Sequence, residues 1–373
     1  MKALFLTFHG FSEHNGITKK IRSQVEALRR NGVETHLCYL RYNPDGSHTR
    51  MIDDGELETY PNSIAGKIQK RIRYRAVTDY ALREGIGLVY IRGANNCNPY
   101  TVAMVRRLKR GGAKVVYEIP TYPYDGEFKA SSRKNKARLQ VDKLCRTSQA
   151  AHLDYIVTYA NVPRIFGAPT IPISNGIDFD KIPVRATRQR PANEFNLIGV
   201  AELHFWHGFD RVIRGMAGYY ASPQEVEVRF HIVGYGTDGT LERLQQMVAE
   251  YGLQEKVIFH GPQYGEALDR VFDLADMGVA SLGRHRSHIT DIKTLKNREY
   301  AARGIPFVYS ENDSDFDDKP YVLKVPADET PVRTADLIAF SDQVRLTPKQ
   351  IRGSIAELSW TNQMKKVLDR LFN

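Results

Sequence analysis

Short apolar segments of β type alternate with amphipathic segments of helical type along the chain, and this alternation limits the fold more than any other feature. In the first half, strands are expected at residues 5–8, 35–40, 87–91, 114–119 and 154–158. The segments between them have helical spacing, as at Ile17, Ile21, Val25 and Leu28. Alternating β and α elements predict parallel sheets with helices on both faces.

The same alternation starts again after residue 190. Strands are expected at residues 195–201, 227–233, 256–259, 277–281 and 306–308. Two such series predict two doubly wound, Rossmann-like α/β domains, at residues 1–182 and 183–358, joined by a proline- and arginine-containing linker within 175–192. Residues 359–373 are expected to form a helix that packs back towards the first domain, because Trp360, Met364, Val367 and Leu371 share one face.

Composition excludes several classes of protein. Of 373 residues, 42% are hydrophobic and 26% are charged, which is typical of a soluble globular protein and unlike a disordered or coiled-coil chain. No apolar run approaches the roughly 18 residues of a membrane span. Three scattered cysteines suit neither a disulfide framework nor a zinc site, and no nucleophile motif is evident. We expect a cytoplasmic protein without a metal or cofactor.

The positive charge of the chain is concentrated in its first half. Residues 1–175 hold 28 Lys and Arg against 15 Asp and Glu, a balance of +13, whereas the remainder has a balance of −3. A basic domain beside a nearly neutral one predicts an anionic partner, whether nucleic acid, phospholipid or a phosphate-bearing substrate. An acidic cluster at Asp45, Asp53, Asp54, Glu56 and Glu58 is interpreted as a solvated loop.

Loops that follow strands are the expected ligand sites of such domains. Residues 9–18 join the first strand to a helix, and Asn15-Gly16 can bring backbone N–H groups to an anion there. Residues 234–239 match G-x-G-x-x-G, but the strand after them ends in His260-Gly261-Pro262 and lacks the carboxylate of a dinucleotide site. The first loop is equally compatible with an ordinary strand-to-helix connection, and the second is compatible with a glycine turn that approaches a nucleotide.

Residues 291–306 are the most informative segment. A helix is expected from about Thr294 to Arg303, with Gly304 and Pro306 as stop signals. Lys293, Thr294 and Lys296 gather at its start, which suits a phosphate, although spacing alone favours a capped surface helix.

Taken together, these segments resemble the retaining glycosyltransferases of family 4, over nearly the whole chain. The likeness is carried by Asn15-Gly16-Ile17, by Asn175-Gly176-Ile177-Asp178, and by residues 232–236, 257–261 and 291–306. The last is similar to the family's E-x7-E element, with Asp291 and Glu299 at its two acidic positions. The resemblance implies the GT-B fold, in which two Rossmann-like domains face each other across a cleft.

The resemblance also implies roles for individual residues. Asp291 would face the sugar near its anomeric carbon, and Glu299 would bind the ribose; these two are the implied catalytic residues. The implied donor-binding residues are Gly16, His207, Gly234, Gln263, Tyr264, Lys293, Thr294, Leu295 and Lys296. No metal is implied, so cationic groups would stabilise the leaving nucleoside diphosphate.

The sequence departs from the family pattern in the first strand of the second domain and in the loop that follows it. By position, Glu202 stands where an arginine is usual and His207 where a lysine is usual. We expect Lys293 and Lys296, rather than Arg298, to supply the missing positive charge.

The first domain would hold the acceptor. Tyr122 and Asp125 lie in a loop rich in aromatic and hydroxyl groups and are expected to border it. Two basic helices are expected, and they suit either an anionic membrane surface or plain solvent exposure, with Ile64, Ile68 and Ile72 packed inward in the latter case. Their cations are Lys67, Lys70, Arg71, Arg73 and Arg75 in one, and Arg133, Lys134, Lys136, Arg138, Lys143 and Arg146 in the other.

These observations favour a retaining transferase that moves a hexose-type sugar from a UDP- or GDP-sugar to a glycan or lipid-linked saccharide in cell-envelope or capsular polysaccharide synthesis. A nucleic-acid-binding protein is the alternative suggested by the +13 balance, but no zinc finger, helix-turn-helix or RNP-like aromatic run supports it. A dinucleotide oxidoreductase rests on residues 234–239 alone.

Overall fold

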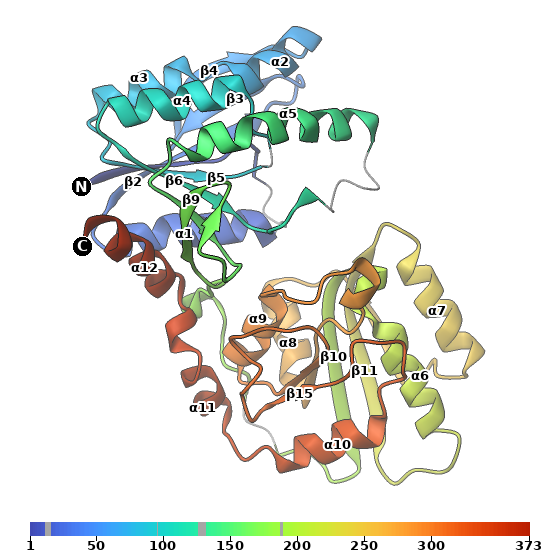
Figure 1. Cartoon of the computed structure of the whole chain (residues 1–373). Coiled ribbons are helices and arrows are strands. Elements are labelled where there is room, and N and C mark those ends of the chain that lie inside the picture. The colour runs from blue at the N-terminus through green and yellow to red at the C-terminus, as the bar shows by residue number, and fades with distance from the viewer. Residues whose placement is uncertain (12–15, 95, 126–131, 187–188) are drawn as a thin grey trace. The chain divides into compact units, whose positions relative to one another are not determined.

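The computed structural model describes residues 1–11, 16–94, 96–125, 132–186 and 189–373. The chain forms two compact units (Figure 1), Met1–Ser174 together with Trp360–Asn373, and Asn175–Ser359. The division therefore lies at Ser174 and not at residue 182. The reason is that Ile177 is tied to the second unit, since its N–H donates to the Leu358 carbonyl at 2.9 Å.

Unit 1 is built on a nine-stranded sheet with the order β4-β3-β2-β1-β5-β6-β7-β9-β8. The strands are β1 Lys2–Leu6, β2 Glu34–Tyr42, β3 His48–Ile52, β4 Gly55–Tyr60, β5 Leu88–Arg92, β6 Lys114–Ile119, β7 Tyr155–Thr158, β8 Arg164–Ile165 and β9 Ala168–Pro172. The central strands are parallel, and the all-buried β5 is apolar along most of its length because helices cover both of its faces.

Helices cover both faces of this sheet (Figure 1). One face is covered by α3 Arg75–Arg83, α4 Pro99–Arg110 and α5 Arg133–Ala150, with α2 Ile64–Ile72 beside α4. The other is covered by α1 Gly16–Arg30 and the C-terminal helix α12 Trp360–Phe372. The apolar face of α12 is buried with α1, and Asn31 Nδ2 donates to the Thr361 carbonyl at 2.9 Å.

Two expectations for unit 1 differ from the structure. In the acidic cluster Asp45, Asp53 and Asp54 lie in turns, but Glu56 and Glu58 lie in β4, because β3 and β4 form an antiparallel hairpin that extends the sheet from β2. The first basic helix is broken, because Arg73 adopts an extended conformation between α2 and α3. Ile64 and Ile68 of α2 are 79% and 52% exposed, so they are not packed inward.

Unit 2 contains a six-stranded parallel sheet with the order β12-β11-β10-β13-β14-β15. The strands are β10 Glu194–Leu203, β11 Glu227–Gly236, β12 Val257–Gly261, β13 Met277–Val279, β14 Phe307–Tyr309 and β15 Val322–Lys324. The helices are α6 Phe209–Tyr219, α7 Thr240–Glu250, α8 Gly265–Leu274, α9 Leu295–Arg303, α10 Thr334–Gln343 and α11 Pro348–Gly353. Short 3-10 turns lie at η2 Phe179–Lys181, η3 Phe205–His207, η4 Arg284–Ser287 and η5 Ala356–Leu358.

The helices of unit 2 also divide between the two faces of its sheet. Residues of α6, α7 and α10 share one apolar cluster with the sheet, and residues of α8, α9 and α11 share another. Among the described residues, no helix is long and apolar enough to cross a membrane.

Candidate active site

The carboxyl edge of the unit 2 sheet has a switch point between β10 and β13. From β10 the chain proceeds through β11 to β12 on one side, and then returns to place β13 on the other side. Loops after two such strands diverge, which leaves room for a ligand at their carboxyl ends. Here the loop after β10 contains η3, the loop after β13 contains η4, and α9 begins nearby.

His207 and Lys296 meet at this switch point. Lys296 Nζ lies 2.8 Å from His207 Nε2, although 89 residues separate them in the sequence. His207 is only 4% exposed, and its ring is held by the backbone N–H of His204, which donates to Nδ1 at 3.1 Å. The His207 carbonyl accepts from the N–H of Leu282 at 2.9 Å, which joins η3 to the segment after β13.

Arg284 and Glu311 complete a cluster of charged groups around Lys296. Glu311 follows β14 and is 2% exposed, yet neither carboxylate oxygen has a hydrogen-bond partner on another described residue. Arg284 lies in η4, with its guanidinium 5.6 Å from the centre of the Trp206 ring. A buried carboxylate without a partner is costly, which is a reason to regard this cluster as a binding site that its ligand completes.

The pKa values of these groups are shifted by the same surroundings. Burial, and then the charge of Arg284, lowers the pKa of Lys296 to about 7. Burial also lowers the pKa of His207 well below its ordinary value, with Lys296 and Arg284 adding to the effect. Burial raises the pKa of Glu311 to about 7. Clustered shifts of this size are typical of functional sites.

Helix α9 is held in place by a buried arginine. Arg298 is fully buried and pairs with Asp313 at 2.6 Å and with Asp315, while its Nε donates to the Asn175 carbonyl at 2.8 Å. Its Nη1 also donates to the Thr294 carbonyl at 2.9 Å. Arg298 therefore fixes the start of the helix and does not offer its charge to a ligand.

The other residues expected to bind the donor at the start of α9 differ in their contacts and exposure. Thr294 is the N-cap, with its hydroxyl accepting from the Asn297 N–H at 3.4 Å, and Leu295 is 40% exposed. Lys293 Nζ donates to Asp315 at 3.3 Å, and the Lys293 carbonyl accepts from Asn175 Nδ2 at 2.5 Å. Lys296 is thus the lysine of this segment that reaches the cluster at the switch point.

The two expected catalytic carboxylates lie on either side of the start of α9. Asp291 is exposed, accepts from the Thr290 hydroxyl at 2.7 Å and pairs by its backbone with Asn312. Glu299 is partly exposed on α9 and accepts from Arg303 at 3.1 and 3.2 Å. Arg303 also pairs with Asp269 at 2.8 Å.

Of the remaining expected donor residues, Gly234 has a structural reason to be glycine. Its φ is +139°, and a Cβ there would lie 1.7 Å from the Ala201 carbonyl oxygen of the neighbouring strand. Gln263 donates to the His260 carbonyl at 2.8 Å, and Tyr264 is 45% exposed. Gly16 is the first residue of α1 in unit 1, and Asn15 lies outside the described residues.

Glu202, which stands where the family pattern has an arginine, contacts His204 and not the cluster around Lys296. It lies at the carboxyl end of β10, half-exposed, with an oxygen 3.6 Å from His204 Nε2. His204 in turn contacts Asp238 at 3.1 Å.

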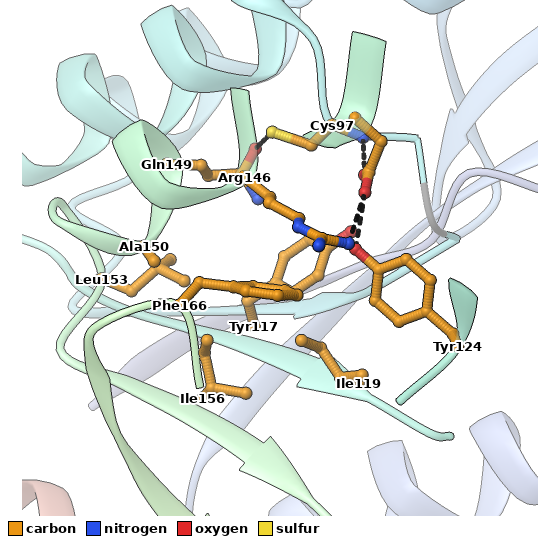
Figure 2. Close-up of a pocket in the computed structure, with 11 residues that line it drawn as sticks. Cys97, Tyr117, Ile119, Tyr124, Arg146, Gln149, Ala150, Leu153, Ile156 and Phe166 are labelled. Carbon is orange, nitrogen blue, oxygen red and sulfur yellow. Dashed lines mark hydrogen bonds and ion pairs between the residues drawn. The ribbon is translucent and has the colours of Figure 1, made fainter. Parts of the chain in front are cut away.

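The residues expected to border an acceptor adjoin a network of paired side chains in unit 1, and Figure 2 shows the part of it around Tyr124 and Arg146. Asp125 accepts from Arg146 at 2.7 Å and pairs with Lys143 at 3.1 Å, so two cations of α5 are neutralised. Tyr124 donates to the buried Asp142 at 2.6 Å, and Figure 2 shows the Arg146 guanidinium above the Phe166 ring. Tyr122 packs edge-on against Phe166. The cavity in Figure 2, which Tyr124, Arg146 and Phe166 help to line, has about 10 Å³, room for about one water molecule.

Arg284 and Glu311 are the residues of the site that sequence reasoning missed. Arg284 lies in a run with Arg286 and two histidines and has no motif around it. Glu311 follows a three-residue strand, and only the strand order brings it beside Lys296. The one sequence signal was that each residue lies three positions beyond the last residue of an expected strand. Among the described residues, no group of three His, Cys, Asp or Glu has a metal-binding arrangement.

Part of unit 2 is similar to a known family of proteins. Residues 194–338, less than half of the chain, match the model of a family described as Glycosyl transferases group 1. No curated protein matches the sequence.

Three solved structures are similar over nearly their whole length. Anabaena Alr3699/HepE in complex with UDP is 15% identical, with 100% of this chain and 99% of that chain covered and a TM-score of 0.64. Sucrose-phosphate synthase (tll1590) from Thermosynechococcus elongatus is 17% identical, with 100% of this chain and 98% of that chain covered and a TM-score of 0.66. A glycosyltransferase from Rickettsia africae ESF-5 is 11% identical, with 99% of this chain and 97% of that chain covered and a TM-score of 0.62. The fold is therefore the GT-B fold of two Rossmann-like domains, as expected.

Proposed function

We propose that this protein transfers a hexose-type sugar from a nucleoside diphosphate sugar to a saccharide acceptor, and that unit 2 binds the donor. The observation that carries the proposal is the cluster of Lys296, His207, Arg284 and Glu311 at the switch point of the unit 2 sheet. The match of residues 194–338 to a glycosyltransferase family and the UDP-bound similar structure support the same assignment.

The cations of the cluster suit the chemistry of the leaving group. When the bond between sugar and diphosphate breaks, negative charge develops on the phosphate oxygen. Lys296 and Arg284 can stabilise that charge in a partly buried, low-dielectric site, where such stabilisation is a large part of catalysis. Because Lys296 and Arg284 supply this positive charge when the donor is bound, we propose that transfer needs no metal ion.

We assign Glu299 to the ribose hydroxyls and Asp291 to the sugar hydroxyls of the donor. A partly exposed carboxylate can accept hydrogen bonds from two neighbouring hydroxyls, and both carboxylates flank the start of α9. We propose same-face attack with retention, in which the leaving phosphate takes the acceptor proton, so no protein nucleophile is required. Gly16, Gly234, Gln263, Tyr264, Lys293, Thr294 and Leu295 remain proposed donor contacts.

For the acceptor we propose a lipid-linked saccharide at an anionic membrane surface, used in envelope or capsular polysaccharide synthesis by a cytoplasmic protein. The observation that favours a membrane over nucleic acid is that exposed aliphatic side chains occur together with cations that form no ion pair among the described residues. Ile64 and Ile68 are exposed beside Lys67 on α2, and Leu144 of α5 is 83% exposed. Nucleic acid would need the cations and not the aliphatic groups.

A thermal-shift screen of the purified chain tests donor binding without knowledge of the acceptor. A ligand that binds the folded state raises Tm, by an amount equivalent to about 2.7 kcal/mol at 100 times Kd. We expect UDP or GDP and the matching sugar nucleotide to raise Tm, equally with and without EDTA, and NAD to have no effect.

The matched variants for this screen are Lys296→Ala and Lys349→Ala, the second on the exposed part of α11. Lys296→Ala is expected to abolish the shift and Lys349→Ala to preserve it. A chain that no nucleoside diphosphate stabilises, or an undiminished shift in Lys296→Ala, would contradict the assignment.

A further inference from the structure

The hydrogen bonds of His207 determine which of its nitrogens carries the proton. Nδ1 accepts from the backbone N–H of His204 at 3.1 Å, so Nδ1 has no proton. The neutral ring must then carry its proton on Nε2. Nε2 is therefore a donor, and it faces Lys296 Nζ at 2.8 Å.

A donor at 2.8 Å requires an acceptor, and an ammonium group has none. Lys296 can accept from Nε2–H only as a neutral amine with a free lone pair. The charged groups around it agree with this state. Arg284 of η4 opposes a second positive charge, and burial disfavours one.

The two carboxylates near Lys296 do not change this conclusion. Glu299 lies on its own helix but pairs with Arg303 at 3.1 Å. Glu311 follows β14, forms no side-chain hydrogen bond with any other described residue, and has its pKa raised to about 7 by its own burial. Neither carboxylate forms an ion pair with Lys296 in the described part of the chain.

We propose that binding of a donor diphosphate charges this site. Lys296 takes a proton from solvent and becomes an ammonium ion, which moves away from His207 and pairs with the phosphates. The same step frees His207 Nε2–H as a second, neutral donor to the phosphate. This inference rests on the proposed function, and it makes His207 the positioning residue that keeps Lys296 uncharged until the donor arrives.

The expected pH dependence follows from the proton balance. Below about pH 7 Lys296 is already charged in the empty site, so donor binding takes up no proton and affinity is independent of pH. Above that pH each binding event takes up a proton, and affinity falls by up to about tenfold for each pH unit. A sugar nucleotide is the right probe, because its diphosphate has no titrating group in this range.

Isothermal titration calorimetry of the full chain with UDP-glucose, and with a GDP-hexose in parallel, measures the proton count. The heats at about pH 8 are compared in two buffers that differ in ionisation enthalpy, and repeated at about pH 6. We expect an uptake that approaches about one proton per site at the higher pH and none at the lower.

Two variants identify the group that takes the proton. Lys296→Arg, which is always charged, is expected to bind the donor without uptake at either pH. Glu311→Gln is expected to retain the uptake. Wild-type binding without uptake at about pH 8, or uptake that is lost in Glu311→Gln and kept in Lys296→Arg, would overturn the inference while leaving donor binding intact. If neither donor binds at all, the donor site itself is wrong, and this inference with it.

Discussion

At the scale of single residues, the candidate site is defined by a buried carboxyl group whose position lowers the stability of the empty protein. Glu311 is buried just after β14 and has no hydrogen-bond partner on another described residue, and burial raises its pKa from 4.5 to about 7. Natural proteins retain a buried unpaired carboxylate where it serves a ligand, because its cost is otherwise removed by a simple substitution. Burial also disfavours the charged forms of Lys296 and His207 in the same cluster.

Replacement of this carboxylate should stabilise the empty protein. Between pH 4.5 and about 7 folded Glu311 retains a proton that the unfolded chain has lost, so its contribution to stability falls as pH rises through this range. We expect Glu311→Gln to raise the free energy of unfolding by roughly 1 kcal/mol at pH 8, or about 2–4 °C in Tm, and to change little at pH 5.

Thermal unfolding at both pH values checks this, with Glu242→Gln, on the exposed start of α7, as the control. A Glu311→Gln protein that is less stable than wild type at pH 8 would show that Glu311 has a partner that stabilises it.

At the scale of elements, helices α2 and α5 present aliphatic and basic side chains together to solvent. Lys67 of α2 and Arg133, Lys134 and Lys136 of α5 form no ion pair within the described residues, and Ile64, Ile68 and Leu144 are exposed among these helices. A surface of this kind binds anionic lipid by charge and by burial of the aliphatic groups.

Vesicle sedimentation tests the membrane proposal. We expect the chain to bind vesicles that contain anionic lipid, with weak binding to neutral vesicles. Ile64→Ser with Ile68→Ser should reduce binding about tenfold or more, since each buried aliphatic side chain contributes about 1.5–3 kcal/mol. Leu274→Ala, at an exposed position on α8, is the control and should bind as wild type.

Equal binding of the Ile64→Ser/Ile68→Ser variant would exclude an aliphatic contribution. Loss of vesicle binding together with tight, salt-sensitive binding to mixed oligonucleotides would favour the nucleic-acid alternative.

The elements also show why sequence predicts some features and not others. Helix α9 was expected at about Thr294 to Arg303 and is Leu295–Arg303, because a threonine cap and Gly304, with φ +77°, are local signals. The β3–β4 hairpin was missed, because its many charged residues conceal a strand at the sheet edge. The gathering of Lys296 with Glu311 and His207 was not predictable in detail, because it depends on strand order across the sheet.

At the scale of the whole molecule, each unit is a doubly wound α/β domain, and the first also gains the C-terminal helix. The double alternation of strands and helices was sufficient to predict this architecture, since it repeats over more than 100 residues in each half. The exact division could not be predicted, because Ile177 joins unit 2 through a hydrogen bond to a residue 181 positions further along the chain.

The most direct test of the central claim is the rate at which the full chain releases nucleoside diphosphate from its sugar donor. The donor is the one selected by thermal shift, and wild type is compared with Glu299→Gln, which leaves Arg303 paired with Asp269. We predict release by wild type in the presence of EDTA and a loss of at least about 100-fold in Glu299→Gln, at unchanged Tm. Release by Glu299→Gln at the wild-type rate, or no release by wild type from any donor that binds, would contradict the account.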